Sequence, residues 1–288
     1  MTKIDYARQD VASEWNATWS AKNVASEARN IDTQSAFFKA VTDTLANVPP
    51  NGTILEGGCG LGRWLLHCQG KYNIFGLERS EIALKALKEY APTSLVACGD
   101  VFQLPLQSDT IDCYLSFGVL EHFEEGPMEG LREAYRVLKP GGTLLISGPG
   151  TSPLSLADSL RELSRLSLVR RLFRKPPIEG ESLFYQYRFR PTEIEHFLKN
   201  AGFKVLQTVY WGNLETLWQY IVPLRHPNTR SFRWYDEVVM SGRPFRLTKL
   251  GKKLYSIIRR FTPWLFHYAW LIQAIKPKSG VINHDPSL

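Results

Sequence analysis

A glycine-rich stretch stands where a predicted strand gives way to a predicted helix. The segment "TILEGGCGLGRW", residues 53–64, places Gly58, Gly60 and Gly62 at alternate positions after a short apolar run. Glycines between a strand and a helix let the backbone turn tightly and approach a ligand closely. The stretch therefore predicts a ligand-binding loop, and its spacing restricts the chemistry of the ligand.

Two phosphate-binding patterns fail on specific residues of this loop. A dinucleotide-binding G-x-G-x-x-G that begins at Gly58 needs a glycine at position 63, where the chain has Arg63. A phosphate loop of the form G-x-x-x-x-G-K-[ST] matches from Gly57 to Gly62, but Arg63 and Trp64 then replace the lysine and the hydroxyl residue. The loop fits neither kind of phosphate site.

Acidic residues stand near the ends of three neighbouring predicted strands. Glu56 ends the strand before the loop, Glu78 ends the next strand, and Asp100 follows the third. A carboxylate in the position of Glu78 can accept both ribose hydroxyls of a nucleoside. Because so much acid would repel a diphosphate, these residues favour a cofactor that carries an ammonium and a sulfonium group.

Strands and helices alternate around these residues. We expect strands at 53–56, 72–78, 94–100, 111–118 and 143–149, and helices at 62–68, 80–90 and 126–142, the second of these capped by Ser80. Apolar strands separated by helices are typical of a parallel sheet covered on both faces.

The flanking regions are predicted to be mainly helical. Residues 5–47 have helical patterns. In the second half we expect a basic helix at 152–175, a helix from Thr192 that Gly202 ends, and a last strand at 266–276. The segment 247–265 is predicted to be a helix with apolar residues on one face and cations on the other.

Four segments in order resemble the successive motifs of class I S-adenosylmethionine (SAM)-dependent methyltransferases. They are "ILEGGCGLGRW", "IFGLERS", "CGDVFQLPLQSDTIDCYLSFGVLEHF" and "LREAYRVLKPGGTLLISGP". Within that family the chain is most similar to the group that includes the ubiquinone and menaquinone biosynthesis methyltransferases. The resemblance covers residues 50–150 closely and 185–211 loosely. It implies a doubly wound α/β fold with a mostly parallel, seven-stranded, Rossmann-like sheet.

The resemblance also implies a domain organisation. It predicts an N-terminal helical lid at 1–48, a SAM-binding core at 49–150, basic helical insertions at 151–184 and 212–263, a late core helix and strand at 185–211, a last core strand at 264–278 and a tail at 279–288.

The matching positions imply contacts with SAM. Gly58, Gly60 and Gly62 would let the backbone approach the methionine part of SAM, with Glu56 near its amino group. Glu78 would bind the ribose hydroxyls, while Asp100 and the Val101 amide would meet the adenine. Phe117 and Gly118 would lie along the methionine part, and the remaining predicted cofactor contacts are Cys59 and Arg79.

The reaction implied is a direct displacement at the methyl carbon, in which the enzyme aligns the reacting groups in a dry pocket. His122 is the candidate general base for a hydroxyl acceptor, with packing or capping as the alternative. Relatives that bind a metal here use an earlier Glu as well, and this chain has Gly118 there, so we predict no metal. Trp15 and Trp19 lie i, i+4 in the predicted lid, where they would cover the site or only pack the helix.

The acceptor is less defined by the sequence. Residues 1–150 carry 13 Lys and Arg against 18 Asp and Glu, a net charge of −5, and residues 151–288 carry 22 against 10, a net charge of +12. The basic half could contact RNA, or an anionic membrane through 247–265, or only form a solvated surface. No Asn-Pro-Pro-Tyr or Asp-Pro-Pro-Tyr follows the fourth strand, which argues against exocyclic amino groups of bases as acceptors.

We therefore expect methyl transfer to the oxygen of a small molecule, lipid-like or glycan-linked. The alternatives are an RNA methyltransferase and a SAM-binding scaffold or regulator without catalysis. The four cysteines lack metal-site or disulfide spacing. The N-terminus lacks a signal peptide, and the longest apolar run is too short to span a bilayer, so we expect a cytoplasmic protein, at most peripheral at the inner membrane face.

Overall fold

The computed structural model describes residues 3–7, 11–29, 31–150, 183–211 and 269–278. These residues belong almost entirely to one compact unit, which comprises 1–150, 182–210 and 270–288. The predicted helices at 152–175 and 247–265 and the predicted tail lie outside the described residues.

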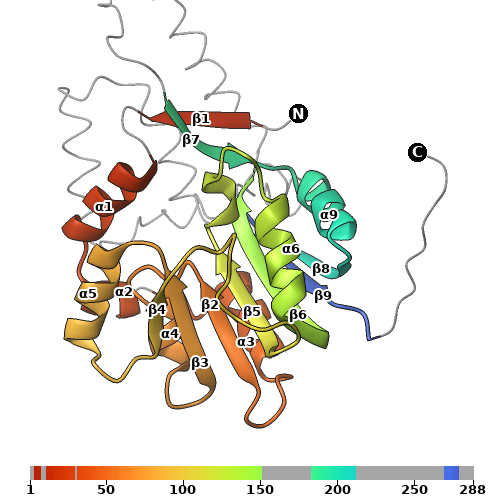
Figure 1. Ribbon diagram of the computed structural model, residues 1–288, viewed down its shortest axis with the longest axis horizontal. Coiled ribbons are helices and arrows are strands. Elements are labelled where there is room, and N and C mark those ends of the chain that lie inside the picture. Colours follow the sequence, from red (N-terminus) through yellow and green to blue (C-terminus); the bar gives the residue numbers. More distant parts are fainter. Residues whose placement is uncertain (1–2, 8–10, 30, 151–182, 212–268, 279–288) are drawn as a thin grey trace, which may run out of the picture. The chain divides into compact units, whose positions relative to one another are not determined.

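A seven-stranded sheet forms the centre of this unit (Figure 1). Its spatial order is β4-β3-β2-β5-β6-β9-β8. The strands are β2 (Thr53–Gly57), β3 (Asn73–Glu78), β4 (Val96–Cys98), β5 (Ile111–Phe117), β6 (Leu138–Pro149), β8 (Lys204–Trp211) and β9 (Ala269–Ile275). The pairs β3–β4, β2–β3, β2–β5 and β5–β6 are parallel. The predicted mostly parallel sheet is confirmed. From β2 the chain adds strands toward one edge of the sheet, and from β5 it adds them toward the other, so the topological switch point lies between β2 and β5. Ligands of such sheets bind at the carboxyl ends of the strands at this point.

Helices cover both faces of the sheet. The helices α2 (Val24–Arg29), α3 (Ala36–Leu45), α4 (Arg63–Cys68) and α5 (Glu81–Tyr90) pack on one face, and α6 (Met128–Val137) and α9 (Pro191–Asn200) pack on the other. Neighbouring strand residues divide between the two cores: Ile54 joins the α3–α5 side and Leu55 the α6 side, while Cys113 and Tyr114 divide in the same way. Because both faces are buried, these strands are apolar at nearly every position.

The ends of several helices follow from single residues. The Ser35 hydroxyl accepts a hydrogen bond from the Phe38 amide and begins α3, and the predicted cap Ser80 accepts one from the Ala83 amide at 3.3 Å. Each cap satisfies an amide in the first helical turn that has no partner within the helix.

The extreme N-terminus differs from the helical prediction for residues 5–47. Residues Lys3–Ala7 form the strand β1, which pairs antiparallel with β7 (Leu183–Arg188), and helix α1 (Val11–Ala21) follows. The prediction was wrong for residues 5–7, and no strand was predicted at 183–188. Each of these strands gains its hydrogen bonds from a partner about 180 positions away, so short local patterns could not indicate the pair.

Strand β6 begins five residues before the predicted position 143, and α6 ends correspondingly earlier than 142. The Pro-Gly-Gly segment was expected to separate helix from strand. Instead, the Gly141 amide donates to the Lys276 carbonyl at 2.7 Å and the Lys276 amide donates to the Gly142 carbonyl at 3.0 Å. These bonds to the residue after β9 extend the strand through the glycines.

Within the described part of the chain, no helix combines the length and the apolar character needed to cross a membrane.

Candidate functional site

The glycine loop lies at the carboxyl end of β2 and leads into α4. Gly58 and Gly60 have φ angles of +75° and +51°, a region that residues with a side chain rarely adopt. A Cβ atom at Gly58 would lie 2.4 Å from Val119 Cγ2, and one at Gly60 would lie 2.8 Å from Trp19 Cη2. The alternating glycines therefore serve two needs, the turn itself and the close approach of neighbouring segments.

Two of the predicted carboxylates hold this loop through its backbone amides. Glu56 is 5% exposed, and its Oε2 accepts a hydrogen bond from the Leu65 amide in the first turn of α4 at 2.7 Å. Glu78 bridges two segments, since Oε2 accepts from the Gly60 amide and Oε1 from the Ser80 amide, both at 2.8 Å. A carboxylate oxygen has a second lone-pair site, so Glu78 can still accept hydrogen bonds from a ligand.

Burial makes the ionised form of Glu56 electrostatically unfavourable. Burial raises the pKa of Glu56 to about 8, although the Leu65 amide and the charge of Arg63 act in the opposite direction. The nearby charge of Glu78 raises it further. A positively charged ligand group placed here would favour the ionised carboxylate and bind well for the same reason.

Arg63, which excluded the phosphate patterns, is held away from a phosphate-binding role. Its guanidinium pairs with Glu27 of α2, which also pairs with Lys22 at 3.4 Å. Burial alone would raise the pKa of Glu27, but Arg63 and Lys22 outweigh it and lower the pKa. The arginine thus anchors α2 against the start of α4.

The adenine-side candidates follow β4. The Oδ1 atom of Asp100 accepts a hydrogen bond from the Phe102 amide at 2.9 Å, which fixes the turn, and Val101 is buried in the core. Arg79 is exposed, and its carbonyl accepts a weak bond from the Cys98 thiol at 3.8 Å. Cys59 is buried, and burial raises its thiol pKa, so it is a packing residue of the loop rather than a reactive thiol.

Phe117 and Gly118 end β5 beside the loop. The Phe117 ring packs edge-on against Phe37 of α3, with ring centroids 5.1 Å apart, and lies 5.7 Å from the Trp64 ring. The Gly118 amide donates to the Ser147 carbonyl of β6 at 3.0 Å. Phe117 therefore closes the core below the loop, and Gly118 stands at the edge of the sheet next to it.

His122 lies at the end of the short 3₁₀ helix η1 (Leu120–His122), between two aromatic rings. Its ring meets the Trp15 ring edge-on at 5.0 Å and the Tyr185 ring at 5.1 Å. Its Nδ1 lies 3.0 Å from the Tyr185 carbonyl oxygen. A carbonyl can only accept, so this bond assigns the proton to Nδ1, and in the neutral ring the lone pair then resides on Nε2.

Helix α1 brings the predicted lid tryptophans to this place. The Trp15 and Trp19 rings stack at 4.9 Å, with Trp15 against His122 and Trp19 against Gly60. The Ser80 hydroxyl donates to the Asn16 side chain at 3.0 Å and ties α1 to the start of α5. The stack connects the glycine loop to the histidine, so the structure brings the predicted lid and the predicted base together.

Sequence reasoning missed Glu121 and Tyr185. Glu121 is 4% exposed and directly precedes His122, whereas Glu124 and Glu125 are exposed, as expected for a solvated turn. The apolar neighbour Leu120 was the available signal that this part of the turn is buried. Tyr185 belongs to β7, and nothing in its local pattern connects it with His122.

No group of His, Cys, Asp and Glu side chains suited to a metal ion occurs among the described residues. Cys59, Cys68, Cys98 and Cys113 are free thiols, and Cys98 is the exposed one among them.

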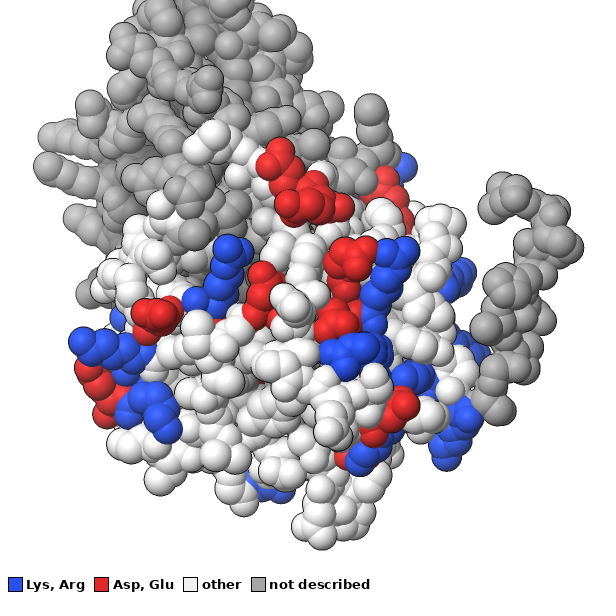
Figure 2. Space-filling model, viewed as in Figure 1, with Lys and Arg blue, Asp and Glu red and all other residues white. Residues whose placement is uncertain are grey.

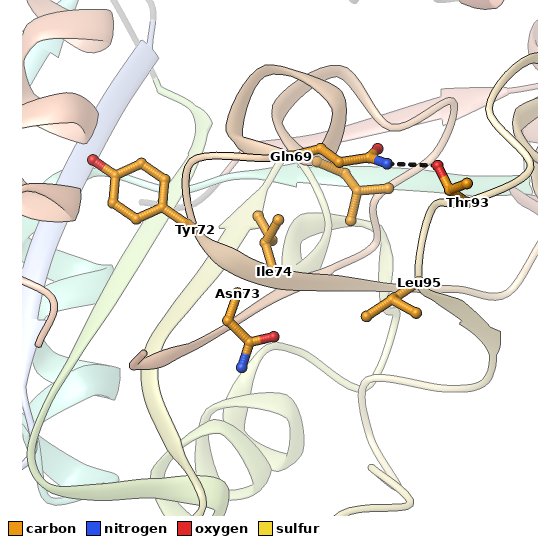
Figure 3. Close-up of a pocket in the computed structure, with 7 residues that line it drawn as sticks. Gln69, Tyr72, Asn73, Ile74, Thr93 and Leu95 are labelled. Carbon is orange, nitrogen blue, oxygen red and sulfur yellow. Dashed lines mark hydrogen bonds between the residues drawn. The ribbon is translucent and has the colours of Figure 1, made fainter. Parts of the chain in front are cut away.

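A small cavity of about 140 Å³ lies at the opposite edge of the sheet (Figure 3). It is lined near the amino ends of β3 and β4 by Leu65, Gln69, Tyr72, Asn73, Ile74, Thr93 and Leu95. Gln69 donates to the Thr93 hydroxyl at 3.0 Å across it. None of the predicted site residues lines this cavity, and the amino edge is not where parallel sheets bind ligands.

Acidic and basic side chains are interspersed over the face of the described residues that Figure 2 shows. That face therefore offers no broad basic surface. Most Lys and Arg residues of 151–288 fall outside the described ranges.

The comparisons with known proteins agree with this geometry. The family described as "Methyltransferase domain" matches residues 55–146, which run from β2 through β6. The ubiquinone/menaquinone biosynthesis C-methyltransferase UbiE of Ruegeria sp. is 36% identical over 115 residues, which cover 37% of this chain and 44% of that protein. A tRNA (carboxymethyluridine(34)-5-O)-methyltransferase of Arabidopsis thaliana is 32% identical over 117 residues, 40% of this chain and 28% of that protein.

Solved structures share the fold. A SAM complex of phosphoethanolamine N-methyltransferase 2 from Haemonchus contortus superposes with a TM-score of 0.52 at 16% identity, covering 83% of this chain and 53% of that one. Residues 55–146 form a methyltransferase domain, and the similarity to SAM-dependent methyltransferases, together with the shared fold, supports a class I SAM-dependent enzyme with SAM as its cofactor. The chain spans between 14% and 59% of the length of the curated relatives that it matches.

Proposed function

We propose that this protein transfers the methyl group of SAM to the oxygen of a small-molecule acceptor, lipid-like or glycan-linked. The carrying observation is the convergence of two sets of residues at one sheet edge. Glu56 and Glu78 hold the glycine loop, and the Trp15–Trp19 stack connects that loop to His122.

The residues around the loop fit a cofactor without phosphate. Glu56 is a buried carboxylate that forms no ion pair with the described residues and would bind the ammonium of SAM, while Glu78 would accept the ribose hydroxyls beside its two amide bonds. Asp100 would accept from the adenine amino group. When bound, SAM supplies an electrophilic methyl group on a sulfonium.

His122 would act as the general base. Its Nδ1–H donates a hydrogen bond to the Tyr185 carbonyl, which orients the ring, and Nε2 would then be the nitrogen that takes the acceptor hydroxyl proton. The acceptor oxygen then forms the new bond to carbon while the carbon–sulfur bond breaks and its electron pair stays on sulfur. The stacked tryptophans would exclude water from this step.

The loop without a phosphate pattern argues for SAM, and the aromatic rings around His122 argue for an acceptor with an apolar body. The absence of the Asn-Pro-Pro-Tyr type of motif after β5 argues against base amino groups. An RNA acceptor is the second candidate, favoured by the match to a tRNA methyltransferase over 40% of this chain. Through the predicted amphipathic segment 247–265, a peripheral contact with anionic membranes is part of the proposal for a lipid-like acceptor.

Two measurements test the proposal. Isothermal titration with SAM and with S-adenosylhomocysteine should show binding of both, and the absence of binding by either would overturn the cofactor assignment. Transfer of labelled methyl groups from SAM into a fractionated cell extract should then label the small-molecule or lipid fraction. Label in RNA would favour the second candidate, and binding with no label in any fraction would favour a non-catalytic SAM-binding scaffold or regulator.

A further inference from the structure

Glu121 is a buried carboxyl group without a charged partner among the described residues. It is 4% exposed, and no Lys, Arg or His in that part of the chain forms an ion pair with it. Burial raises the pKa of Glu121 to about 8, and only its own backbone amide and that of Val119 act in the opposite direction. A carboxylate in such a place is costly unless a cation joins it, and groups of this kind gather at functional sites.

The carboxyl group lies at the carboxyl ends of two neighbouring strands. A Cβ atom at Gly118, directly after β5, would lie 3.7 Å from Glu121 Oε1, and one at Gly148, near the end of β6, would lie 3.5 Å from the same oxygen. Apart from the two chain neighbours of Gly118, Oε1 is the one described atom within 4 Å of the Cβ position there, whereas at Gly148 the Trp270 ring lies nearer, at 2.9 Å. The oxygen therefore borders a space that the absence of a side chain at Gly118 leaves open.

The segment that carries Glu121 also contacts the parts of the site already described. Val119, two positions before Glu121, packs against Gly58 of the glycine loop, and His122, one position after it, packs against Trp15. Glu121 thus belongs to the same short segment as a residue that packs on the loop that would hold the methionine part of SAM and as the ring that would take the acceptor proton.

We infer that Glu121 is a further cofactor-binding residue, whose carboxylate recognises the positive charge of the SAM sulfonium. This inference rests on the proposed function. Methyl transfer leaves the sulfur as a neutral thioether, so the attraction disappears with the reaction, and the product is bound less tightly than the substrate cofactor.

The role is one of affinity and not of rate. The sulfonium charge disperses as the methyl group leaves, so a carboxylate beside it stabilises the bound reactant at least as much as the transition state. Removing the charge should therefore weaken SAM binding without lowering the rate at saturating SAM.

The test is Glu121→Gln, which keeps the shape of the side chain and removes its charge, with Glu125→Gln as the matched control. Glu125 is an exposed acid in the same turn. Titrations at pH 8.5 would compare three probes: SAM, S-adenosylhomocysteine, and a quaternary ammonium analogue of SAM that has a permanently charged nitrogen at the sulfur position. We expect E121Q to lose about tenfold or more in affinity for the two cationic probes and less than threefold for the neutral one.

Equal losses for all three probes would assign Glu121 a purely structural role and overturn the inference, as would unchanged binding of all three. Glu121→Asp retains the charge and should recover part of the SAM affinity if E121Q is poorly folded. If the wild type binds SAM but E121Q shows none of these differences from it, the proposed function stands and only the role of Glu121 is rejected. A wild type that binds none of the probes overturns both.

Discussion

The proposed cofactor side and the proposed acceptor side of the site are built in different ways. The cofactor side comes from one continuous stretch, in which Glu56, the glycine loop and Glu78 lie within 23 residues and bind one another through backbone amides. The acceptor side is assembled from Trp15, His122 and Tyr185, which belong to three distant segments. The first depends on local geometry, and the second depends on how α1 and β7 pack onto the sheet.

The difference has a chemical consequence. Carboxylates and amides that short hydrogen bonds hold in place suit a cofactor whose structure does not vary. A ring held between two other rings can tolerate changes in the neighbouring segments, and such changes would alter the acceptor without disturbing the cofactor. If this division is correct, substitutions on the two sides should separate the rate from SAM affinity.

The largest expected effect is on the acceptor side. His122→Ala should lower the rate of methyl transfer at saturating SAM by a factor of about 10²–10⁴, the usual contribution of a general base. SAM affinity should change less than threefold, because none of the loop contacts involves this ring. Single-turnover transfer of labelled methyl groups and isothermal titration measure the two quantities. A rate within threefold of the wild type would reduce His122 to a packing residue.

On the cofactor side, Glu78→Ala should weaken SAM binding on the order of 100-fold. The substitution removes a charged acceptor from the Gly60 and Ser80 amides, each worth about 1.5–3 kcal/mol, and also removes the ribose contact. Titration with SAM measures this loss. Glu81→Ala is the control, since Glu81 is exposed in the next helix and makes none of these bonds. Equal affinity of the two variants would contradict the assignment of Glu78.

The accuracy of the sequence-based predictions also differs between local and long-range features. The strands β2, β3 and β5 and the cap at Ser80 were predicted to within one residue or two, because each depends on its own apolar run or on a neighbour three positions away. The pairing of β1 with β7 was missed, because each strand needs a partner that is distant in sequence. The early start of β6 was missed because Lys276 supplies the bonds that keep Gly141 and Gly142 in the strand.

The candidate site divides likewise. The order of the motifs predicted the loop and its carboxylates, and the structure places them in contact. Glu121 is buried where η1 lies beside Gly118 and Gly148, and no short sequence pattern indicates that arrangement. The orientation of His122 by the Tyr185 carbonyl required β7 to be placed first.

A smaller effect concerns the stability of the loop. Gly58→Ala should lower the free energy of unfolding by about 1–3 kcal/mol more than Gly70→Ala does. Both glycines have nearly the same φ, +75° and +78°, but only the first has a neighbour within 4 Å of the Cβ position, namely Val119. The difference in unfolding free energy between the two variants, measured in urea, therefore separates the steric clash with Val119 from the backbone strain that both variants share. Equal destabilisation would mean that Val119 yields and that the approach to η1 is loose.

The pH dependence of stability links the two sides. Burial raises the pKa of Glu121 to about 8, well above the value of 4.5 for an exposed glutamate. Between about pH 4.5 and 8 the unfolded chain has lost this proton while the folded protein retains it, so this group lowers the stability of the ligand-free protein as the pH rises, by at most about 1.4 kcal/mol per pH unit. The pKa of Glu56 is also raised to about 8, so Glu56 adds its own contribution to the pH dependence of stability. Comparing the wild type with E121Q separates the contribution of Glu121, because Glu56 is present in both. The variant should show a shallower decline in urea unfolding over this range, and the difference should shrink in saturating SAM, because a bound cation favours the ionised carboxylate. Parallel curves for the two proteins without ligand would show that Glu121 is already ionised in the empty site, and its burial would then need a cation from elsewhere in the chain.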